Sequence, residues 1–224
     1  QLFERYNLPP KNNTIPIDFS HWSLIDLSAF DEVEMVWRDF HDNTYNVALP
    51  RVMTDHAIQA GRKEDFDRTI VHYMQPHLPY IGHAFSEARP PTSLEREGYE
   101  QLETGDASRE EVYEIYRETL RLVLDDIEGL LENVDAETVA ITADHGEAFG
   151  EFGAYGHPEG FPHPIVKKVP WVETTATDEG TRKPDLETSG RDEVDLEQHL
   201  EDLGYCWKSV LIRSSVKAPF NIRH

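Results

Sequence analysis

One long helix constrains the fold of this chain more than any other feature. Ser108 and Glu111 form a capping-box pattern, and apolar residues then recur every three or four positions as far as Val134. Strand-like stretches flank this helix at residues 69–74 and 138–142. A strand, a long helix and a second strand predict a βαβ unit, whose strands are parallel and joined right-handedly. The sequence therefore predicts an α/β fold in which both strands end at one edge of a sheet.

The other segments have weaker patterns. We expect short helices at residues 24–40 and 53–61, and an amphipathic helix at residues 194–203. The chain is long enough for one domain, which we place at residues 1–205. Residues 206–224 carry basic side chains and no acidic ones, so we expect a tail that is disordered or foreign to the domain.

The balance of charged residues limits which binding partners and which cellular compartment we expect. The chain has 43 Asp and Glu against 21 Lys and Arg, a formal net charge of -22. Such a surface repels nucleic acid and membranes, so neither is an expected partner. The even spread of acidic residues favours a halophilic protein, with an ordinary acidic protein as the alternative. Because the sequence contains no signal peptide or spanning apolar run, we expect a cytoplasmic protein.

A carboxylate and an imidazole stand side by side after the second strand, at Asp144-His145-Gly146. Ligands bind beyond the carboxyl ends of parallel strands, and both side chains are donors for divalent cations. A helix cap or a salt-bridged turn would explain the pair equally well. Glu147 comes next, and it either orients His145 as a hydrogen-bond partner or begins a helix.

Two more histidines lie in loops stiffened by proline. His77 stands between Pro76 and Pro79, after the first strand, and it is a candidate substrate ligand or general acid. An exposed loop residue is the alternative. His157 follows Gly156 downstream of the Asp-His pair.

These motifs resemble, in their order, the C-terminal half of the sulfatase family, within the alkaline-phosphatase-like superfamily of metal-dependent ester hydrolases. The resemblance covers roughly residues 70 to 205, and its motifs lie at residues 71–80, 142–147, 153–158 and 167–171. It implies a parallel sheet sandwiched between helices on both faces. Residues 169–171 are expected to be buried.

The resemblance also implies roles for the site residues. Asp144 and His145 would bind a divalent metal ion, calcium first, with manganese, magnesium or zinc as alternatives. His77 and His157 would be catalytic and would bind a small anionic ester, with Lys168 as a further substrate ligand. Many sulfatases have lysine where this chain has His157, so the substrate could be a sulfate ester, a phosphoester or a phosphonate.

The family's nucleophile motif, Cys/Ser-x-Pro-x-Arg, is absent, and only residues 15–18 faintly resemble its paired metal-binding aspartates. The resemblance therefore predicts an N-terminally incomplete domain of a sulfatase-like hydrolase. The alternatives are a phosphodiesterase, phosphonate hydrolase or phosphotransferase of the same superfamily, and an inactive truncated remnant. Thr54-Asp55-His56 resembles the Asp-His pair but lacks the strand and the glycine, so we interpret it as unrelated to the site.

Overall fold

The computed structural model describes residues 29–63, 66–158, 160–186 and 211–214, and these residues form a mixture of helices and short strands. The elements in chain order are β1 (Glu32–Glu34), α1 (Val36–Asp39), α2 (Pro50–Lys63), β2 (Arg68–Val71), α3 (Gly82–Ser86), α4 (Ser93–Thr104), α5 (Arg109–Leu131), β3 (Ala136–Thr142), β4 (Ala148–Phe149), β5 (Tyr155–Gly156), α6 (Pro164–Lys167), β6 (Trp171–Ala176) and β7 (Leu211–Ser214).

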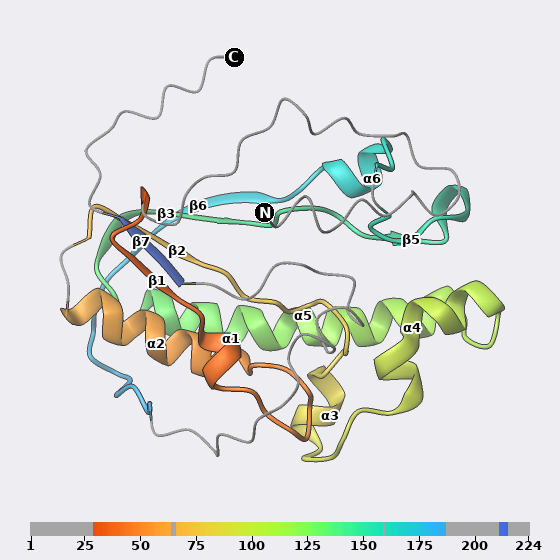
Figure 1. Ribbon diagram of the computed structural model, residues 1–224, viewed down its shortest axis with the longest axis horizontal. Coiled ribbons are helices and arrows are strands. Elements are labelled where there is room, and N and C mark those ends of the chain that lie inside the picture. Colours follow the sequence, from red (N-terminus) through yellow and green to blue (C-terminus); the bar gives the residue numbers. More distant parts are fainter. Residues whose placement is uncertain (1–28, 64–65, 159, 187–210, 215–224) are drawn as a thin grey trace.

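Helix α5 confirms the strongest prediction from the sequence. The Ser108 hydroxyl accepts a hydrogen bond from the backbone N–H of Glu111 (3.2 Å), and the Glu111 carboxylate accepts one from the N–H of Ser108 (2.8 Å). Val112 and Val123 are buried on the inner face. The helix runs along the centre of the molecule and packs against α2, α3 and α4 (Figure 1).

The strand pairings differ from the prediction. All pairings among the described strands are antiparallel: β7 lies between β1 and β2, β3 pairs with β6, and β4 pairs with β5. The predicted parallel pairing of β2 with β3 is therefore wrong for the described strands. In β3, half-buried Val139 and Ile141 alternate with exposed neighbours, as is usual for an antiparallel strand with one solvated face.

Other local predictions had mixed outcomes. Helix α2 confirms the helix predicted at residues 53–61, whereas the described part of residues 24–40 contains β1 and only four residues of helix, α1. Strand β1 forms because β7 offers it hydrogen bonds from far along the chain. The predicted burial of residues 169–171 is wrong, because all three are exposed and Trp171 is 65% exposed.

The C-terminal predictions lie largely outside the described residues. The helix expected at residues 194–203 cannot be compared for that reason. Within the tail expected at residues 206–224, Leu211–Ser214 form the central strand of a three-stranded sheet.

Two hydrophobic clusters anchor the helices to α5. The first lies around α2 and α3 and includes Leu49, Met53 and Ile81. The second contains Tyr80, Val112 and Phe149, with the half-buried Tyr99 and Tyr116 packed against it. This second cluster supports the segment that carries the Asp-His motif.

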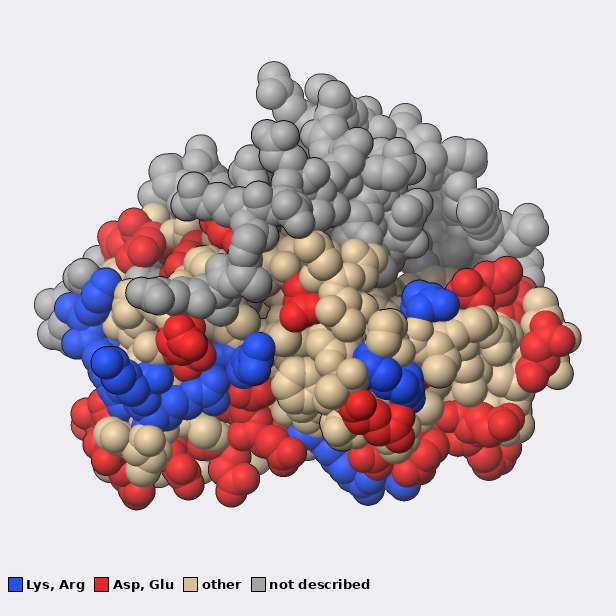
Figure 2. Space-filling view, turned by 90° about the horizontal axis from the view of Figure 1, so that it is seen from below, with Lys and Arg blue, Asp and Glu red and all other residues tan. Residues whose placement is uncertain are grey.

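Acidic side chains are spread over the face seen in Figure 2, with Lys and Arg side chains among them. In the part of the chain that the structure describes, no helix has both the length and the apolar character needed to cross a membrane.

Candidate metal centre

A tight backbone contact fixes the path of the motif after β3. The Gly146 N–H donates to the carbonyl oxygen of Val166 (3.2 Å), and the Thr142 hydroxyl donates to that of Pro170 (2.7 Å). A Cβ atom at position 146 would lie 2.2 Å from the carbonyl oxygen of Ile165. The close approach of α6 therefore requires glycine here, rather than any unusual backbone dihedral angle.

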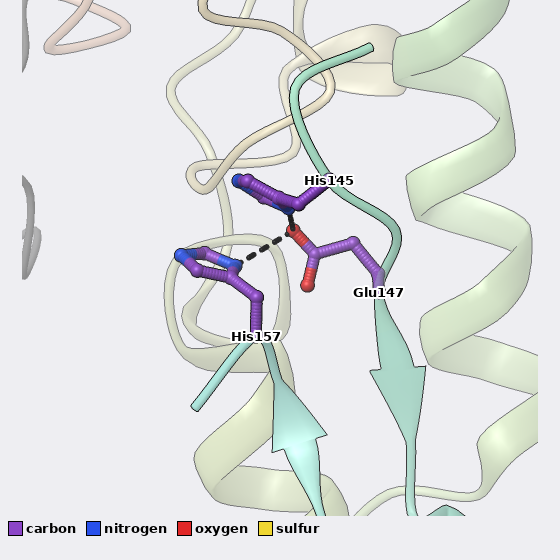
Figure 3. Close-up of side chains that lie close together, drawn as sticks. All are labelled: His145, Glu147 and His157. Carbon is purple, nitrogen blue, oxygen red and sulfur yellow. Dashed lines mark hydrogen bonds and ion pairs between the residues drawn. The ribbon is translucent and has the colours of Figure 1, made fainter. Parts of the chain in front are cut away.

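Three side chains converge beyond this contact: His145, Glu147 and His157 (Figure 3). One ligand atom from each lies within 4.8 Å of the other two. The pairing of Ala148 with Gly156 in the β4–β5 ladder brings Glu147 and His157, the next residues outward, to the same side of the motif. The short ladder thus brings together residues ten positions apart in the sequence.

The Glu147 carboxylate lies between the two imidazoles. Its Oε1 atom is 2.9 Å from Nδ1 of His157 and 3.6 Å from Nδ1 of His145. The two rings stack, with centroids 4.0 Å apart and an angle of 29° between their planes. The Glu147 side chain is only 10% exposed, so this carboxylate depends on its polar neighbours for stabilisation.

The second oxygen of that carboxylate contacts Tyr99. The Tyr99 hydroxyl donates a hydrogen bond of 3.0 Å to Oε2 of Glu147. Burial raises the pKa of this hydroxyl, and the neighbouring Tyr80 and Glu147 raise it further, so Tyr99 stays a donor in the physiological pH range.

His77 also belongs to this site. Its ring centroid lies 5.9 Å from that of His157, and its Nδ1 donates to the carbonyl oxygen of Leu78 (2.8 Å). Burial lowers the pKa of His77; the hydrogen bond to Leu78 opposes this shift, and the adjacent His157 adds to it. His77 is therefore a neutral imidazole with its proton on Nδ1 at neutral pH.

Asp144 does not join the three-residue cluster. Its side chain is 63% exposed, and its Oδ1 accepts a hydrogen bond from the backbone N–H of His145 (3.0 Å). Oδ2 lies 3.6 Å from Nε2 of His145, whereas Glu147 lies on the Nδ1 side of the same ring. Asp144 and Glu147 thus approach His145 at opposite ring nitrogens.

A pocket of about 320 Å³ lies beside the cluster. Its lining includes the predicted His77 and His157, but not the predicted Lys168, which is exposed and follows the last residue of α6. The pocket is lined by His77, Leu78, Arg96, Tyr99, Tyr155, Gly156, His157 and Pro158.

Sequence reasoning missed Arg96 and Tyr99 because it did not predict α4. The signal was present: Thr92 and Glu95 form a second capping box immediately before these residues. The sequence predicts Glu147 as a partner of His145 or as a helix start, and the structure has it in an irregular segment just before β4, 3.6 Å from Nδ1 of His145.

The Asp55-His56 pair lies in buried positions of α2. Asp55 accepts a hydrogen bond from Arg182, and His56 contacts the Glu34 carboxylate. These contacts tie α2 to neighbouring segments, consistent with our interpretation that the pair is unrelated to the site.

Comparisons with protein family models, curated proteins and solved structures found no match.

Proposed function

We propose that His145, Glu147 and His157 bind a divalent transition-metal ion and that the adjacent pocket binds a small anionic ester for hydrolysis. The observation that carries this proposal is the convergence of two imidazoles and a mostly buried carboxylate within 4.8 Å. Two histidines and one carboxylate are a donor set of catalytic zinc sites, which keep a further position open for water or substrate.

The donor set fits zinc or manganese better than calcium. Calcium takes six to eight oxygen ligands, whereas imidazole nitrogen suits zinc and other transition metals. The three ligand atoms, which lie within 4.8 Å of one another, would adjust their spacing around an ion with bonds of about 2.0–2.2 Å. A bound ion would polarise an oxygen of the ester group and so stabilise the charge that develops during cleavage.

The pocket supplies partners for the rest of the ester. Arg96 brings a guanidinium group, whose planar donors match sulfate or phosphate oxygens. His77 offers an imidazole beside His157, and with its proton on Nδ1, held by the Leu78 carbonyl, its Nε2 would accept a hydrogen bond or a proton, as from an attacking water. Leu78, Tyr155 and Pro158 provide apolar surface for an organic group.

The ordered motifs that resemble sulfatases support the same chemistry. We favour a sulfate ester as substrate on that resemblance. A phosphoester is the second candidate, because His157 stands where many sulfatases have lysine.

Calorimetric titration with zinc, manganese and calcium tests the metal centre. We expect zinc or manganese to bind more tightly than calcium. Glu147→Gln should weaken binding by more than the 10- to 100-fold that loss of a ligand's hydrogen-bond partner typically costs. Asp144→Asn is the matched control, and its affinity should change by less than about threefold. The reverse order of effects would assign the metal to Asp144 and Nε2 of His145 instead.

Hydrolysis of 4-nitrophenyl sulfate and 4-nitrophenyl phosphate by the zinc-loaded protein tests the reaction. We expect metal-dependent turnover that falls on substitution His77→Gln or Arg96→Gln. Faster cleavage of the phosphate would replace the sulfatase assignment with the phosphoester alternative. Tight metal binding without turnover of either ester would contradict the hydrolase proposal and favour an inactive metal-binding remnant.

A further inference from the structure

One residue outside the three proposed ligands contacts the metal centre through Glu147. We infer that Tyr99 is a positioning residue, whose hydroxyl holds one oxygen of Glu147 so that the other oxygen faces His145 and His157. This inference rests on the proposed metal centre and goes beyond it by assigning a role to a residue on a different helix.

The two oxygens of Glu147 have separate partners. Oε2 accepts the hydrogen bond of 3.0 Å from Tyr99, while Oε1 lies 2.9 Å from Nδ1 of His157. A carboxylate held in this way presents a single oxygen to an ion between the imidazoles. The hydrogen bond therefore favours monodentate coordination, which leaves more of the coordination sphere open to substrate.

The Tyr99 ring is itself fixed by packing. It contacts Tyr80 edge-on, with centroids 6.1 Å apart, and lies 5.7 Å from the Phe149 ring. Such aromatic contacts restrict the ring and place the hydroxyl at a defined point. Phe149 belongs to β4, which begins directly after Glu147, so the same small unit fixes both the donor and the acceptor.

Two glycines lie next to this ring cluster. A Cβ atom at Gly98 would lie 2.9 Å from the Tyr80 ring, which would push apart the ring pair that supports Tyr99. Gly156 has a positive φ of 68°, and a Cβ atom there would lie 3.5 Å from the Tyr99 ring. Glycine at position 98 thus leaves the space that the ring pair needs, whereas at position 156 the positive φ favours glycine and the 3.5 Å distance is an ordinary contact.

One substitution distinguishes a positioning role of Tyr99 from a packing role. Tyr99→Phe keeps the ring and removes only the hydroxyl. Loss of a hydrogen-bond partner of a metal ligand typically costs 10- to 100-fold in affinity, and we expect a zinc dissociation constant raised by about that factor. Tyr116→Phe is the matched control, because Tyr116 packs in the same ring cluster but its hydroxyl is not the one that contacts Glu147.

The experiment is calorimetric zinc titration of the wild type and of the single variants Tyr99→Phe, Tyr116→Phe and Glu147→Gln. The double variant that combines Tyr99→Phe with Glu147→Gln is titrated in the same way. Thermal unfolding of the metal-free proteins checks that each is folded. We expect Tyr99→Phe to weaken zinc binding in the wild-type background and to change it by less than twofold in the Glu147→Gln background, because Tyr99 acts through Glu147. The visible absorption bands of the cobalt-substituted protein should change with Tyr99→Phe and not with Tyr116→Phe.

The possible failures are distinguishable. If the wild type binds zinc and Tyr99→Phe binds it equally well, the positioning role is overturned and the metal centre stands. An equal loss in both Glu147 backgrounds would overturn the inference, because Tyr99 would then act through general packing. If the wild type binds no metal, the proposed function fails, and the inference fails with it.

Discussion

At the scale of single residues, Gly146 determines whether α6 can close against the metal-binding segment. Gly146→Ala would place a Cβ atom 2.2 Å from the carbonyl oxygen of Ile165, which is a backbone atom and cannot rotate away. Overpacking of this kind typically costs 1–3 kcal/mol. We expect the free energy of unfolding to fall by about 2 kcal/mol in urea denaturation, and zinc affinity to fall with it.

Gly129→Ala provides the control for that substitution. Its Cβ would meet only a side-chain atom of Arg182 at 3.6 Å, and alanine in a helix is favoured over glycine by about 0.8–1 kcal/mol. This variant should be as stable as the wild type or more so. If Gly146→Ala were equally well tolerated, the close contact with α6 would not exist in solution.

The residues of the site were only partly predictable from the sequence. His77, His145 and His157 were identified from motifs, and the structure brings all three together. The place of Glu147 depends on which residue of β4 pairs with which residue of β5, and a two-residue strand carries no periodic pattern that reveals its partner. Tyr99 depends on the contact of α4 with this ladder, which is a tertiary feature.

At the scale of elements, the capping box of α4 makes the stability of the protein depend on pH. Burial raises the pKa of Glu95, but hydrogen bonds from Arg89 and Thr92 lower it more, so its pKa in the folded state lies below the ordinary value of a glutamate side chain. The stabilisation is therefore complete above that value and is lost as the pH falls through the lower pKa of the folded state.

Glu95→Gln removes this contribution. The difference in melting temperature between the wild type and Glu95→Gln should be largest at neutral pH and should shrink below about pH 4. Glu100→Gln, an exposed glutamate of the same helix, is the control and should change the melting temperature little at any pH. A wild-type advantage over Glu95→Gln that grew on acidification would contradict this account.

The segment that follows β6 is tied to the helices by Arg182. Arg182 donates to Asp55 of α2 (2.7 Å) and to Asp126 of α5 (3.1 Å), and both carboxylates are mostly buried. Arg182→Ala would leave two carboxylates without their cation, so we expect a loss of about 2–4 kcal/mol in the free energy of unfolding.

Lys183→Ala serves as the control for Arg182→Ala, because Lys183 is exposed; it should change the free energy of unfolding by less than about 0.5 kcal/mol. Equal effects of the two variants in urea denaturation would show that Arg182 does not hold the segment in place.

The elements differ in how well the sequence predicted them, for a physical reason. Helix α5 is specified by its own capping box and apolar periodicity, so local information sufficed. Strands β2 and β3 were also located, but their partners β7 and β6 lie far along the chain. Pairing direction depends on these distant segments, and a strand–helix–strand pattern alone wrongly favoured parallel neighbours.

At the scale of the whole molecule, the net charge of -22 destabilises the folded state, because like charges repel one another more when the chain is compact. Added salt shortens the screening length from about 10 Å at 0.1 M to about 3 Å at 1 M, which weakens repulsion between exposed carboxylates. It also weakens exposed ion pairs, but these contribute little, and mostly buried pairs such as Arg182 with Asp55 are screened less. Repulsion among the excess acidic groups should therefore dominate.

We expect the free energy of unfolding to rise between 0.1 and 2 M KCl, measured by urea denaturation with circular dichroism. A parallel series in sucrose at matched viscosity controls for general solvent effects. A free energy that stayed constant or fell with KCl would show that repulsion among the acidic groups does not limit the stability of this fold.

The most direct test of the metal centre is a crystal grown with zinc and measured at the zinc absorption edge. The anomalous difference map should contain a peak within bonding distance, about 2.0–2.2 Å, of His145, Glu147 and His157. A peak coordinated by Asp144 in place of Glu147, or no peak at either position, would contradict the metal centre proposed for this protein.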